Sequence, residues 1–292
     1  MNIRGRRIAL LGHIGRPQVR RAALHLEASL RRRGAIVRVE SALAETAELE
    51  GTPVDDLGRW CQLMISLGGD GTVLVAGRAL AGRRGTLLPI NYGGMGFLAS
   101  AEAEETDEAL DAVFAGRWPV AERYGVESRV RHVGGRARPA SFALNDIVIR
   151  NGSSLAAVHL QVSSQGHNLG HLVADGLIAA SAGGSTAYSL SAGGPVLESG
   201  LRAMVVTPAC AHSLGSRSLV LGPETRLSVR IVSPGPALLV LDGQAPVTLA
   251  HGDEVEVGLS PRVVRVHQNP ERPFLHTLQA KLRWQGTEKR SQ

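Results

Sequence analysis

The hydrophobic positions in the first third of the chain alternate between short apolar runs and stretches with helical spacing. Strand-sized apolar runs lie at residues 8–11, 36–39, 63–67 and 87–91. Between them, apolar side chains recur every three or four residues, first from Val19 to Leu30. Helices are also predicted at residues 73–81 and 106–114. This β-α-β-α order predicts a Rossmann-like α/β domain at residues 1–118, with helices on both faces of a parallel sheet.

After Trp118 the helical spacing largely disappears, and strand-like stretches follow one another. These stretches lie at residues 126–133, 142–150, 157–162, 227–232, 237–241, 254–257 and 263–266. Turn-forming pairs such as Asn151-Gly152 and Gln165-Gly166 separate them. The pattern predicts a second domain at residues 119–270, an antiparallel β-sandwich.

The C-terminal segment returns to helical periodicity. Leu275, Leu278 and Leu282 are three or four residues apart. A helix with one apolar stripe needs a surface to cover. We therefore expect residues 271–292 to pack back on the first domain.

The composition is that of a globular chain long enough for two domains. Its 292 residues are 43% hydrophobic and 20% charged, which argues against disorder and fibrous repeats. No apolar run approaches the roughly 20 residues of a membrane span, and the basic start is not followed by a signal-peptide core. We therefore expect a protein that does not bind membranes. Because Cys61 and Cys210 cannot build a disulfide framework, we also expect it to be cytoplasmic.

The net charge of +6 and the pI of about 10.1 come almost entirely from arginine, since only Lys281 and Lys289 are lysines. The arginines are scattered, with short clusters at residues 31–33 and 83–84, and aromatic residues make up only 3% of the chain. We therefore expect no nucleic-acid partner, because such an interface needs a concentrated basic surface. A basic chain does suit acidic substrates such as nucleotides.

The sharpest local feature is Gly68-Gly69-Asp70-Gly71-Thr72, between a predicted buried strand and a predicted helix. Ligands of open α/β sheets bind at this position, and consecutive glycines expose N–H groups that can cradle phosphate. A carboxylate among such donors would repel phosphate unless it holds a metal ion or accepts a proton from an attacking hydroxyl. The alternative is a tight turn in which Asp70 caps the helix. The chain has no Walker-type motif.

Two further segments combine glycine with polar residues. Asn91-Tyr92-Gly93-Gly94-Met95-Gly96-Phe97 also follows a strand, and its glycines indicate either close backbone approach to a ligand or a mobile loop. The segment from Asp175 to Pro195 is rich in small and hydroxyl residues, which suit a short helix lying against a flat, polar ligand. Tyr188 is available there to stack on a base or a ribose. The alternative is a structural crossing of small residues.

Two polar groups interrupt the strands of the second domain. Asn145-Asp146 lies in an apolar stretch and is expected to be buried and hydrogen-bonded, or else to form a turn or bulge. Asp242-Gly243-Gln244 on its own predicts a hairpin turn. Each group becomes informative only together with the glycine-rich segments.

The order and spacing of these segments, with Thr207–Leu214, resemble the NAD kinase family, enzymes that phosphorylate NAD to NADP. The resemblance extends from about Ile8 to Trp284, including the closing Lys281-Leu282-Arg283-Trp284. The Gly-Gly-Asp-Gly-Thr motif is shared with diacylglycerol and sphingosine kinases, whereas the long motif Ser185–Pro195 is far more specific. The family's fold is an α/β domain and a β domain with NAD between them, in agreement with the break predicted near Trp118.

The resemblance implies roles for individual residues. Asp70 matches the family's catalytic aspartate, which activates the ribose hydroxyl. The phosphate-contacting loop corresponds to Gly68, Gly69, Gly71 and Thr72. The positions implied to bind NAD are Asp70, Gly71, Phe97, Asn145, Asp146, Asp175, Thr186, Ala187, Tyr188, Ser189, Leu190, Ser191 and Gln244.

The chain departs from the family pattern beside the long motif. Ser181-Ala182-Gly183-Gly184 stands where Thr-Pro-Thr-Gly is common, so a proline is lost and Gly183 lacks a hydroxyl. Without the proline we expect a more flexible loop. Asp146 replaces a commoner glutamate and reaches about one methylene less. Ala211 and Ser218 replace prolines.

The implied reaction is transfer of the terminal phosphate of ATP, or of polyphosphate, to the adenosine 2′-hydroxyl of NAD, with Mg²⁺ as cofactor. The resemblance also implies a homodimer or homotetramer, and we assign no residue as a metal ligand. Two alternatives stay open. One is a lipid kinase of the diacylglycerol or sphingosine type, which does not explain Thr186–Pro195. The other is a non-catalytic sensor that binds NAD(H).

Overall fold

The structure is a computed structural model that describes residues 3–94, 96–152, 157–213 and 215–282. Its contacts divide the chain into two units. Unit 1 comprises Met1–Glu122 and Val264–Gln292, and unit 2 comprises Arg123–Val263. Unit 2 is therefore inserted into the sequence of unit 1. Among the described residues, no helix combines the length and the apolar character needed to cross a membrane.

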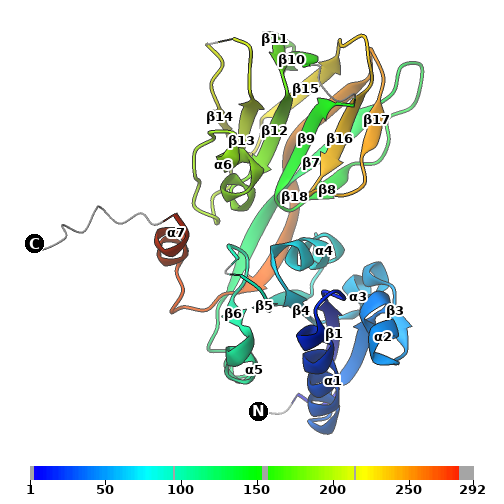
Figure 1. The fold of residues 1–292 in the computed structure, drawn as a ribbon, viewed down its shortest axis with the longest axis vertical. Coiled ribbons are helices and arrows are strands. Elements are labelled where there is room, and N and C mark those ends of the chain that lie inside the picture. Colours follow the sequence, from blue (N-terminus) through cyan, green and yellow to red (C-terminus); the bar gives the residue numbers. More distant parts are fainter. Residues whose placement is uncertain (1–2, 95, 153–156, 214, 283–292) are drawn as a thin grey trace, which may run out of the picture. The chain divides into compact units, whose positions relative to one another are not determined.

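Unit 1 has a parallel sheet with the strand order β18-β5-β4-β1-β2-β3, and β6 pairs with the far end of β5 (Figure 1). Its strands are β1 (Arg7–Gly12), β2 (Ile36–Glu40), β3 (Gly51–Thr52), β4 (Leu63–Gly68), β5 (Thr86–Asn91), β6 (Ala101–Glu102) and the last residues of β18 (Glu254–His267). All six residues of β4 are buried, as expected for a central parallel strand. The Rossmann-like α/β prediction is confirmed.

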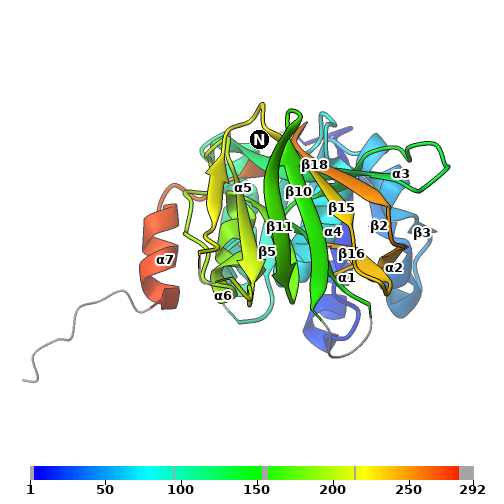
Figure 2. The same cartoon turned by 90° about the horizontal axis from the view of Figure 1, so that it is seen from above.

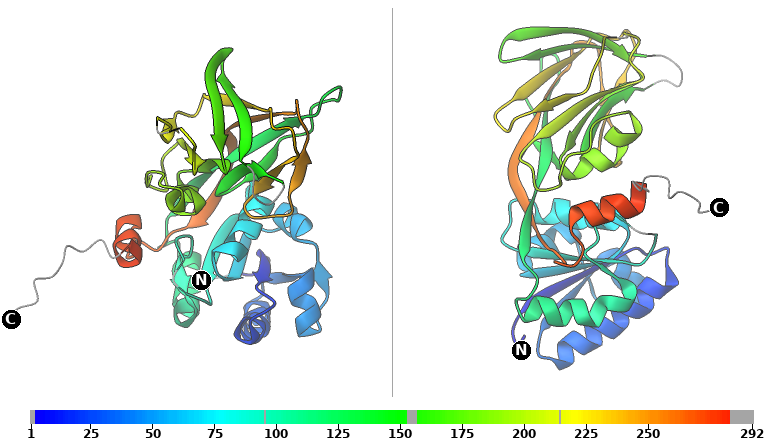
Figure 3. Two further views of the ribbon diagram at one scale, coloured as in Figure 1. Left: turned by 45° about the horizontal axis from the view of Figure 1, so that its top comes forward. Right: turned by 90° about the vertical axis from the view of Figure 1, so that its left-hand side faces the viewer.

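Helices lie on both faces of this sheet. The helical elements of unit 1 are α1 (Pro17–Arg32), α2 (Ser41–Ala47), α3 (Val54–Trp60), α4 (Asp70–Leu80), the 3₁₀ turn η1 (Ala103–Glu105), α5 (Thr106–Phe114) and α7 (Phe274–Leu282). Helices α1 and α5 lie on one face and share its apolar core, while α3 packs with α4 on the other (Figure 3). The short helices α2 and α3 were not among the predicted elements.

The C-terminal helix belongs to unit 1, as predicted. Leu278 of α7 is buried, and the ammonium of Lys281 lies 4.4 Å from the centre of the Phe97 ring. Just before the helix, Arg272 forms an ion pair with Glu105 at 2.7 Å. Arg283 and Trp284 of the closing motif lie outside the described residues.

Unit 2 is an antiparallel sandwich of two sheets. One sheet has the order β11-β10-β15-β18, joined by β7 and β8, and the other has the order β14-β13-β12-β9-β16-β17. Its elements besides β18 are β7 (Val120–Arg131), β8 (Ser141–Ala143), β9 (Asp146–Asn151), β10 (Val158–Ser164), β11 (His167–Ala174), β12 (Gly176–Ser181), η2 (Gly183–Thr186), α6 (Tyr188–Ser191), β13 (Met204–Ala209), β14 (Leu219–Leu221), β15 (Arg226–Ile231), β16 (Ala237–Leu241) and β17 (Val247–Leu249). Figure 2 shows the neighbouring strands β10, β11 and β15.

Apolar side chains from both sheets meet in one core, which includes Leu160 and Val229 of one sheet and Ile149 and Leu177 of the other. The alternation of buried and exposed residues along these strands supplies this core. The predicted β-sandwich is therefore confirmed.

Three predictions of secondary structure need correction. The stretches at residues 254–257 and 263–266 form the single strand β18, which Pro261 does not interrupt. The stretch 142–150 is instead two strands, because the chain bends at Leu144 and Asn145. The segment from Asp175 to Pro195, predicted as a short helix, begins with the buried strand β12 before the 3₁₀ turn and α6.

The boundaries between the units also differ from those predicted at 118/119 and 270/271. By contacts, the chain divides after Glu122 and after Val263. Both divisions fall inside long strands, β7 and β18, which continue from one unit into the other. A continuous strand gives no Pro- or Gly-rich linker signal, so a change in sequence pattern cannot locate the division within it.

Candidate active-site residues in the two units

The glycine-rich loop of unit 1 connects β4 to α4, at the carboxyl end of the central strand. Asp70 is the first residue of α4, and Gly69 occupies the N-cap position. A Cβ on Gly68 would lie 2.3 Å from the hydroxyl of Thr72, so a side chain does not fit there. At Gly69 and Gly71 a Cβ would have no heavy atom within 4 Å among its neighbours. The loop is therefore tight at its start and open where a ligand would approach.

The carboxylate of Asp70 does not cap its own helix. It accepts hydrogen bonds from the backbone N–H of Phe97 at 3.0 Å and of Leu98 at 3.2 Å. A Cβ on Gly96 would lie 2.0 Å from Oδ1 of Asp70, so only glycine allows this approach. The structure thus brings together the two glycine-rich segments of unit 1, and the helix-cap alternative for Asp70 is wrong.

The second glycine-rich segment is fixed at its start by Asn91. The Asn91 amide donates to the carbonyl of Gly93 at 3.2 Å and to the carboxylate of Glu102 at 2.7 Å, and Gly93 N–H donates back to Asn91 Oδ1 at 3.1 Å. Arg272 in turn donates to Glu102 at 3.3 Å. Glu102 and Arg272 therefore position this segment, although Met95 within it lies outside the described residues.

A pocket of about 510 Å³ lies beside the first glycine loop, at the carboxyl ends of β1 and β4. Its lining includes Gly69, Gly71 and Thr72 together with His13 and Arg16. The volume is within the range of about 300–1,000 Å³ that is usual for small-molecule sites. Unit 1 therefore offers a concave surface with glycine N–H groups and basic side chains, which suits phosphate groups.

In unit 2, the carboxylate of Asp242 holds the segment that contains Asn145 and Asp146. It accepts hydrogen bonds from three successive backbone N–H groups, those of Leu144 at 2.9 Å, Asn145 at 2.8 Å and Asp146 at 3.2 Å. Asp242 has φ +48° and is followed by Gly243 with φ +68°, which confirms the predicted hairpin turn. The structural role of Asp242 was missed, because its Asp-Gly turn signal says nothing about a partner that lies 96–98 residues away.

Asp146 is a buried carboxyl group beside a second one. Its pKa is raised to about 6, mainly by burial and also by the nearby charge of Asp242, while a hydrogen bond from the backbone N–H of Tyr188 opposes the shift. Its neighbour Asn145 is also buried, and Oδ1 of Asn145 has no hydrogen-bond partner among the described residues. A buried acceptor without a partner is costly unless a ligand supplies a donor.

The segment that departs from the family pattern is anchored to Asn145. Ser181 donates through Oγ to the carbonyl of Leu144 at 2.6 Å and accepts from the N–H of Gly184 at 3.0 Å. A Cβ on Gly184 would lie 2.1 Å from the carbonyl oxygen of Asn145. Ser181 thus ties the two segments together, and the greater flexibility expected from the lost proline stays a prediction.

The remaining candidates of unit 2 occupy different environments. The Tyr188 side chain is 48% exposed, whereas Ser189 is buried and its hydroxyl lies 2.9 Å from that of Thr207. Thr186 donates to the carbonyl of Gly183 at 3.1 Å. The candidates Ala187 and Leu190 are partly buried, and Ser191 and Gln244 are exposed.

Asp175 is separated from the other candidates of unit 2. It precedes β12, in which Gly176 pairs with Arg150, whereas Ala180 near the other end pairs with Asp146. Its carboxylate makes a hydrogen bond with the thiol of Cys210, which together with its charge raises the pKa of that thiol. The structure therefore groups Asn145, Asp146 and the Tyr188 backbone, and leaves Asp175 at the opposite end of the strand.

Two family descriptions match the chain. The ATP-NAD kinase N-terminal domain matches residues 27–118, and the ATP-NAD kinase C-terminal domain matches residues 144–268. The chain belongs to the NAD kinase family. The predicted family is confirmed, the chain is a phosphotransferase of this family, and the lipid-kinase alternative is set aside.

Relatives at the sequence level support the same assignment. The chain is 34% identical over 286 residues to an NAD kinase of Magnetococcus marinus, covering 96% of this chain and 94% of the relative. It is 41% identical over 221 residues to an NAD kinase of Symbiobacterium thermophilum, covering 75% of this chain and 78% of the relative.

Two solved structures are similar in fold. Yeast NADH kinase complexed with NADH superposes with a TM-score of 0.91 at 24% identity, covering 99% of this chain and 91% of the other. An NAD kinase from Archaeoglobus fulgidus in complex with ATP has a TM-score of 0.76 at 25% identity, covering 96% of this chain and all of the other. At 24% identity, the similarity to the yeast enzyme shows the fold alone.

Proposed function

We propose that this chain transfers the terminal phosphate of ATP to the adenosine 2′-hydroxyl of NAD, giving NADP and ADP. The observation that carries the proposal is the placement of Asp70. Its carboxylate stands at the start of α4, at the carboxyl end of β4, between two glycines that line the pocket of unit 1. Membership in the NAD kinase family supports the choice of NAD as acceptor.

In this mechanism the residues of unit 1 hold the donor. The N–H groups of Gly69 and Gly71 at the start of α4 would bind the phosphates, because a helix N-terminus favours anions. The N–H of Thr72 already donates to the carbonyl of Gly69 at 2.9 Å, so Thr72 would contribute through its position beside them. Arg16 lines the same pocket and would add positive charge there, and His13 beside it offers a ring nitrogen. Phosphoryl transfer depends mainly on positioning and on neutralising this charge.

Asp70 would orient the 2′-hydroxyl and accept its proton. The hydroxyl oxygen forms a bond to the terminal phosphorus, the bond from that phosphorus to the bridging oxygen breaks, and the proton passes to Asp70. A carboxylate offers about four acceptor positions, and two of those on Asp70 are used by the N–H groups of Phe97 and Leu98. The others are available to the substrate hydroxyl.

Mg²⁺ fits this site as a partner of the phosphates. No cluster of three or more metal-ligating side chains occurs in the part of the chain that the structure describes. Mg²⁺ commonly binds through one carboxylate together with substrate phosphates and waters, and Asp70 is the carboxylate available for that role. When bound, the ion would neutralise negative charge on the phosphates.

Unit 2 would supply contacts to NAD. Oδ1 of Asn145 is a buried acceptor that can receive a ligand N–H or O–H, and Asp146 lies beside it. The exposed ring of Tyr188 is available to stack on the dinucleotide. Thr186, Ala187, Ser191 and Gln244 remain candidate contacts, whereas the buried hydroxyl of Ser189 already pairs with Thr207 and supports a packing role.

The test is NADP formation by the purified chain. Reactions with NAD or NADH would be combined with ATP or polyphosphate, in Mg²⁺ or in excess chelator, with Asp70→Asn as the control. We expect NADP with ATP, its loss in chelator, and its loss in the variant. Product with polyphosphate would extend the donor range. NAD binding without any product from the wild-type chain would instead favour the sensor alternative.

The family resemblance further leads us to propose a homodimer or homotetramer. Light scattering coupled to size-exclusion chromatography would give the mass of the assembly directly. A mass of 30.8 kDa, that of one chain, would contradict this proposal.

A further inference from the structure

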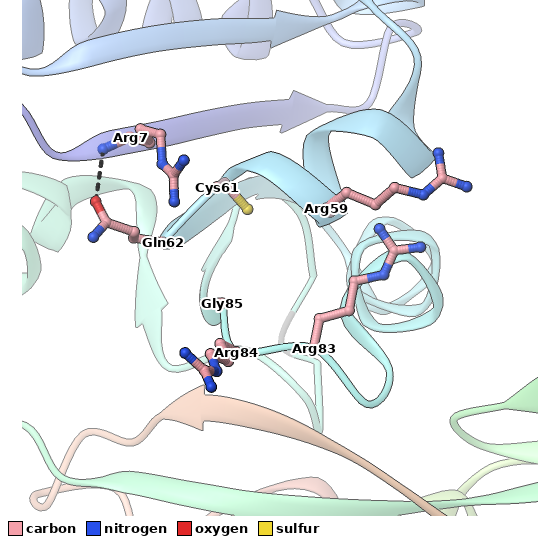
Figure 4. Close-up of a pocket in the computed structure, with 8 residues that line it drawn as sticks. Arg7, Arg59, Cys61, Gln62, Arg83, Arg84 and Gly85 are labelled. Carbon is pink, nitrogen blue, oxygen red and sulfur yellow. Dashed lines mark hydrogen bonds between the residues drawn. The ribbon is translucent and has the colours of Figure 1, made fainter.

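A second pocket of unit 1 lies at the amino ends of the parallel strands, opposite the glycine loops at their carboxyl ends. It has a volume of about 720 Å³ and opens at the amino ends of β1, β4 and β5. The residues that line it are Arg7, Gly58, Arg59, Cys61, Gln62, Arg83, Arg84 and Gly85. Figure 4 shows the side chains of its four arginines placed around the Cys61 thiol.

The positive charge of this pocket is only partly neutralised. Arg59 forms an ion pair with Asp56 at 2.6 Å, in which both side chains are more than half exposed. Arg83 donates to the backbone carbonyl of Asp55 at 2.7 Å, which provides no full charge. Within the described ranges, neither Arg7 nor Arg84 has an ion-pair partner, and the pocket lining contains no carboxylate.

The floor of the pocket is uncharged and closely packed. Cys61 is buried, and burial raises the pKa of its thiol to about 11, so the sulfur stays protonated near neutral pH. Gly85 packs against it, since a Cβ there would lie 2.9 Å from Leu80 and 3.0 Å from the Cys61 carbonyl oxygen. The thiol is therefore a neutral surface beneath the guanidinium groups, and not a nucleophile.

The loop that carries two of the arginines is held in place from β18. Arg265 donates to the carbonyl oxygen of Arg83 at 3.0 Å, and Arg83 N–H donates to the carbonyl of Leu80 at 2.9 Å. On the other wall, Gln62 accepts from the N–H of Arg7 at 3.0 Å (Figure 4). The backbones that present the guanidinium groups are thus fixed before any ligand binds.

We propose that this pocket binds a chain of two or three phosphates, either inorganic or part of a nucleotide. Guanidinium groups bind phosphate oxygens in pairs of parallel hydrogen bonds, which favours arginine at such sites. Four arginines around one pocket suit a ligand with several phosphate groups better than a ligand with a single carboxylate group. The site is distinct from the glycine loop, because strand β4 separates the two by about 20 Å.

The location of binding can be tested with tripolyphosphate at constant ionic strength. Hydrogen exchange would be measured with and without the ligand on the intact chain. We expect new protection in peptides that cover residues 58–62 and 83–86, besides any protection at the glycine loop. Protection confined to residues 68–72 would show that phosphate binds only at the active site and would overturn the proposal.

The contribution of the arginines can be tested by calorimetric titration of the same ligand. The double variant Arg7→Ala/Arg84→Ala should weaken tripolyphosphate binding at this pocket by at least about tenfold, given the strength of charge-assisted contacts. The control Arg129→Ala/Arg131→Ala removes the same charge from exposed positions on β7 and should leave it unchanged. An equal loss of affinity in both variants would show that binding depends only on the net charge of the protein. That result would contradict a specific phosphate site at this pocket.

The chemical source of the phosphates is distinguished by comparing ATP, AMP and tripolyphosphate on the Arg7→Ala/Arg84→Ala variant and the wild-type chain. Similar arginine-dependent binding of ATP and tripolyphosphate would assign the site to the phosphate chain alone. Arginine-dependent binding of ATP only would assign it to a nucleotide. If AMP binds as tightly as ATP in an arginine-dependent manner, recognition of a phosphate chain is wrong. Circular dichroism melting of each variant would show that the fold is retained.

Discussion

Each unit contains an aspartate whose carboxylate holds a loop from far along the chain. The two carboxylates differ in how many backbone N–H groups they accept and in how exposed they are. Asp70 accepts two backbone N–H groups, from residues 27 and 28 positions away, and is partly exposed. Asp242 accepts three, from residues 96 to 98 positions away, and is only 8% exposed. The first carboxylate can still receive a substrate, whereas the second is enclosed by the chain.

This difference separates a reactive group from a structural one. Both carboxylates use backbone donors, so hydrogen bonding alone does not identify the catalytic residue. What distinguishes Asp70 is remaining acceptor capacity next to a pocket lined by Gly69 and Gly71. What distinguishes Asp242 is that its removal would leave three N–H groups without an acceptor in a buried segment.

The largest effect is expected for Asp70→Asn. If Asp70 accepts the proton of the 2′-hydroxyl, the rate of NADP formation should fall by about 10²–10⁴. Stability should change little, because the asparagine carbonyl keeps one acceptor for the loop. Turnover numbers and thermal midpoints of the two proteins would show this. Turnover near that of the wild-type chain would contradict the catalytic role.

The next largest effect is expected for Asp242→Ala. Three backbone N–H groups would lose their acceptor, and we expect the free energy of unfolding to fall by about 3 to 4 kcal/mol. Urea unfolding would measure the change. Asp242→Asn is the matched control, since it keeps one acceptor oxygen and should be less destabilising. A loss below about 1 kcal/mol in Asp242→Ala would show that the loop is held mainly by other contacts.

Asp146 should make stability depend on pH. Its folded-state pKa of about 6 exceeds the usual unfolded value, so its contribution to stability is present at low pH and is lost as the pH rises through about 6. Between pH 4 and 7 this loss should be about 2 to 3 kcal/mol. Urea titrations across this range would detect it, and Asp146→Asn should flatten the profile. An equally steep profile in Asp146→Asn would assign the effect to another group.

A smaller effect is expected at Tyr188, where the backbone and the side chain have separate roles. The backbone N–H bonds to Asp146, while the ring is exposed. Tyr188→Ala should therefore raise the KM for NAD by about fivefold, through lost ring contact, and leave kcat and stability nearly unchanged. Tyr188→Phe keeps the ring and should preserve the KM. An unchanged KM in Tyr188→Ala would exclude a contact with NAD.

The features that were predicted from sequence depend on local pattern. The run 63–67 followed by Gly68–Thr72 specifies a buried strand, a tight turn and a helix through neighbouring residues alone, and β4 and α4 occupy these positions. The helical spacing from Val19 to Leu30 likewise places one buried face on α1. Family resemblance then supplied the chemistry, because a glycine loop by itself does not specify its ligand.

The features that were not predicted depend on contacts between distant segments. Nothing in Asp242-Gly243 indicates that its carboxylate holds Leu144 and Asn145. Glu102 and Arg272 lie in polar stretches with no motif. Glu102 nevertheless contacts Asn91, 11 residues away, and is itself contacted by Arg272, 170 residues away. Strand β12 was missed because its alanines, serine and glycine have low strand propensity, and its burial between β9 and β13 outweighs that propensity.

The insertion of unit 2 within unit 1 determines the order in which the chain can be completed during synthesis. The sheet of unit 1 lacks its pairing of Arg265 and Val266 with Thr86 and Leu87 until β18 has been made. All of unit 2 leaves the ribosome before that moment, since its last residue is Val263. Unit 1 is therefore the first to begin and the last to be completed. Until β18 has been made, Thr86 and Leu87 of β5 have no partner on that edge, which leaves a short segment open to non-native strand pairing.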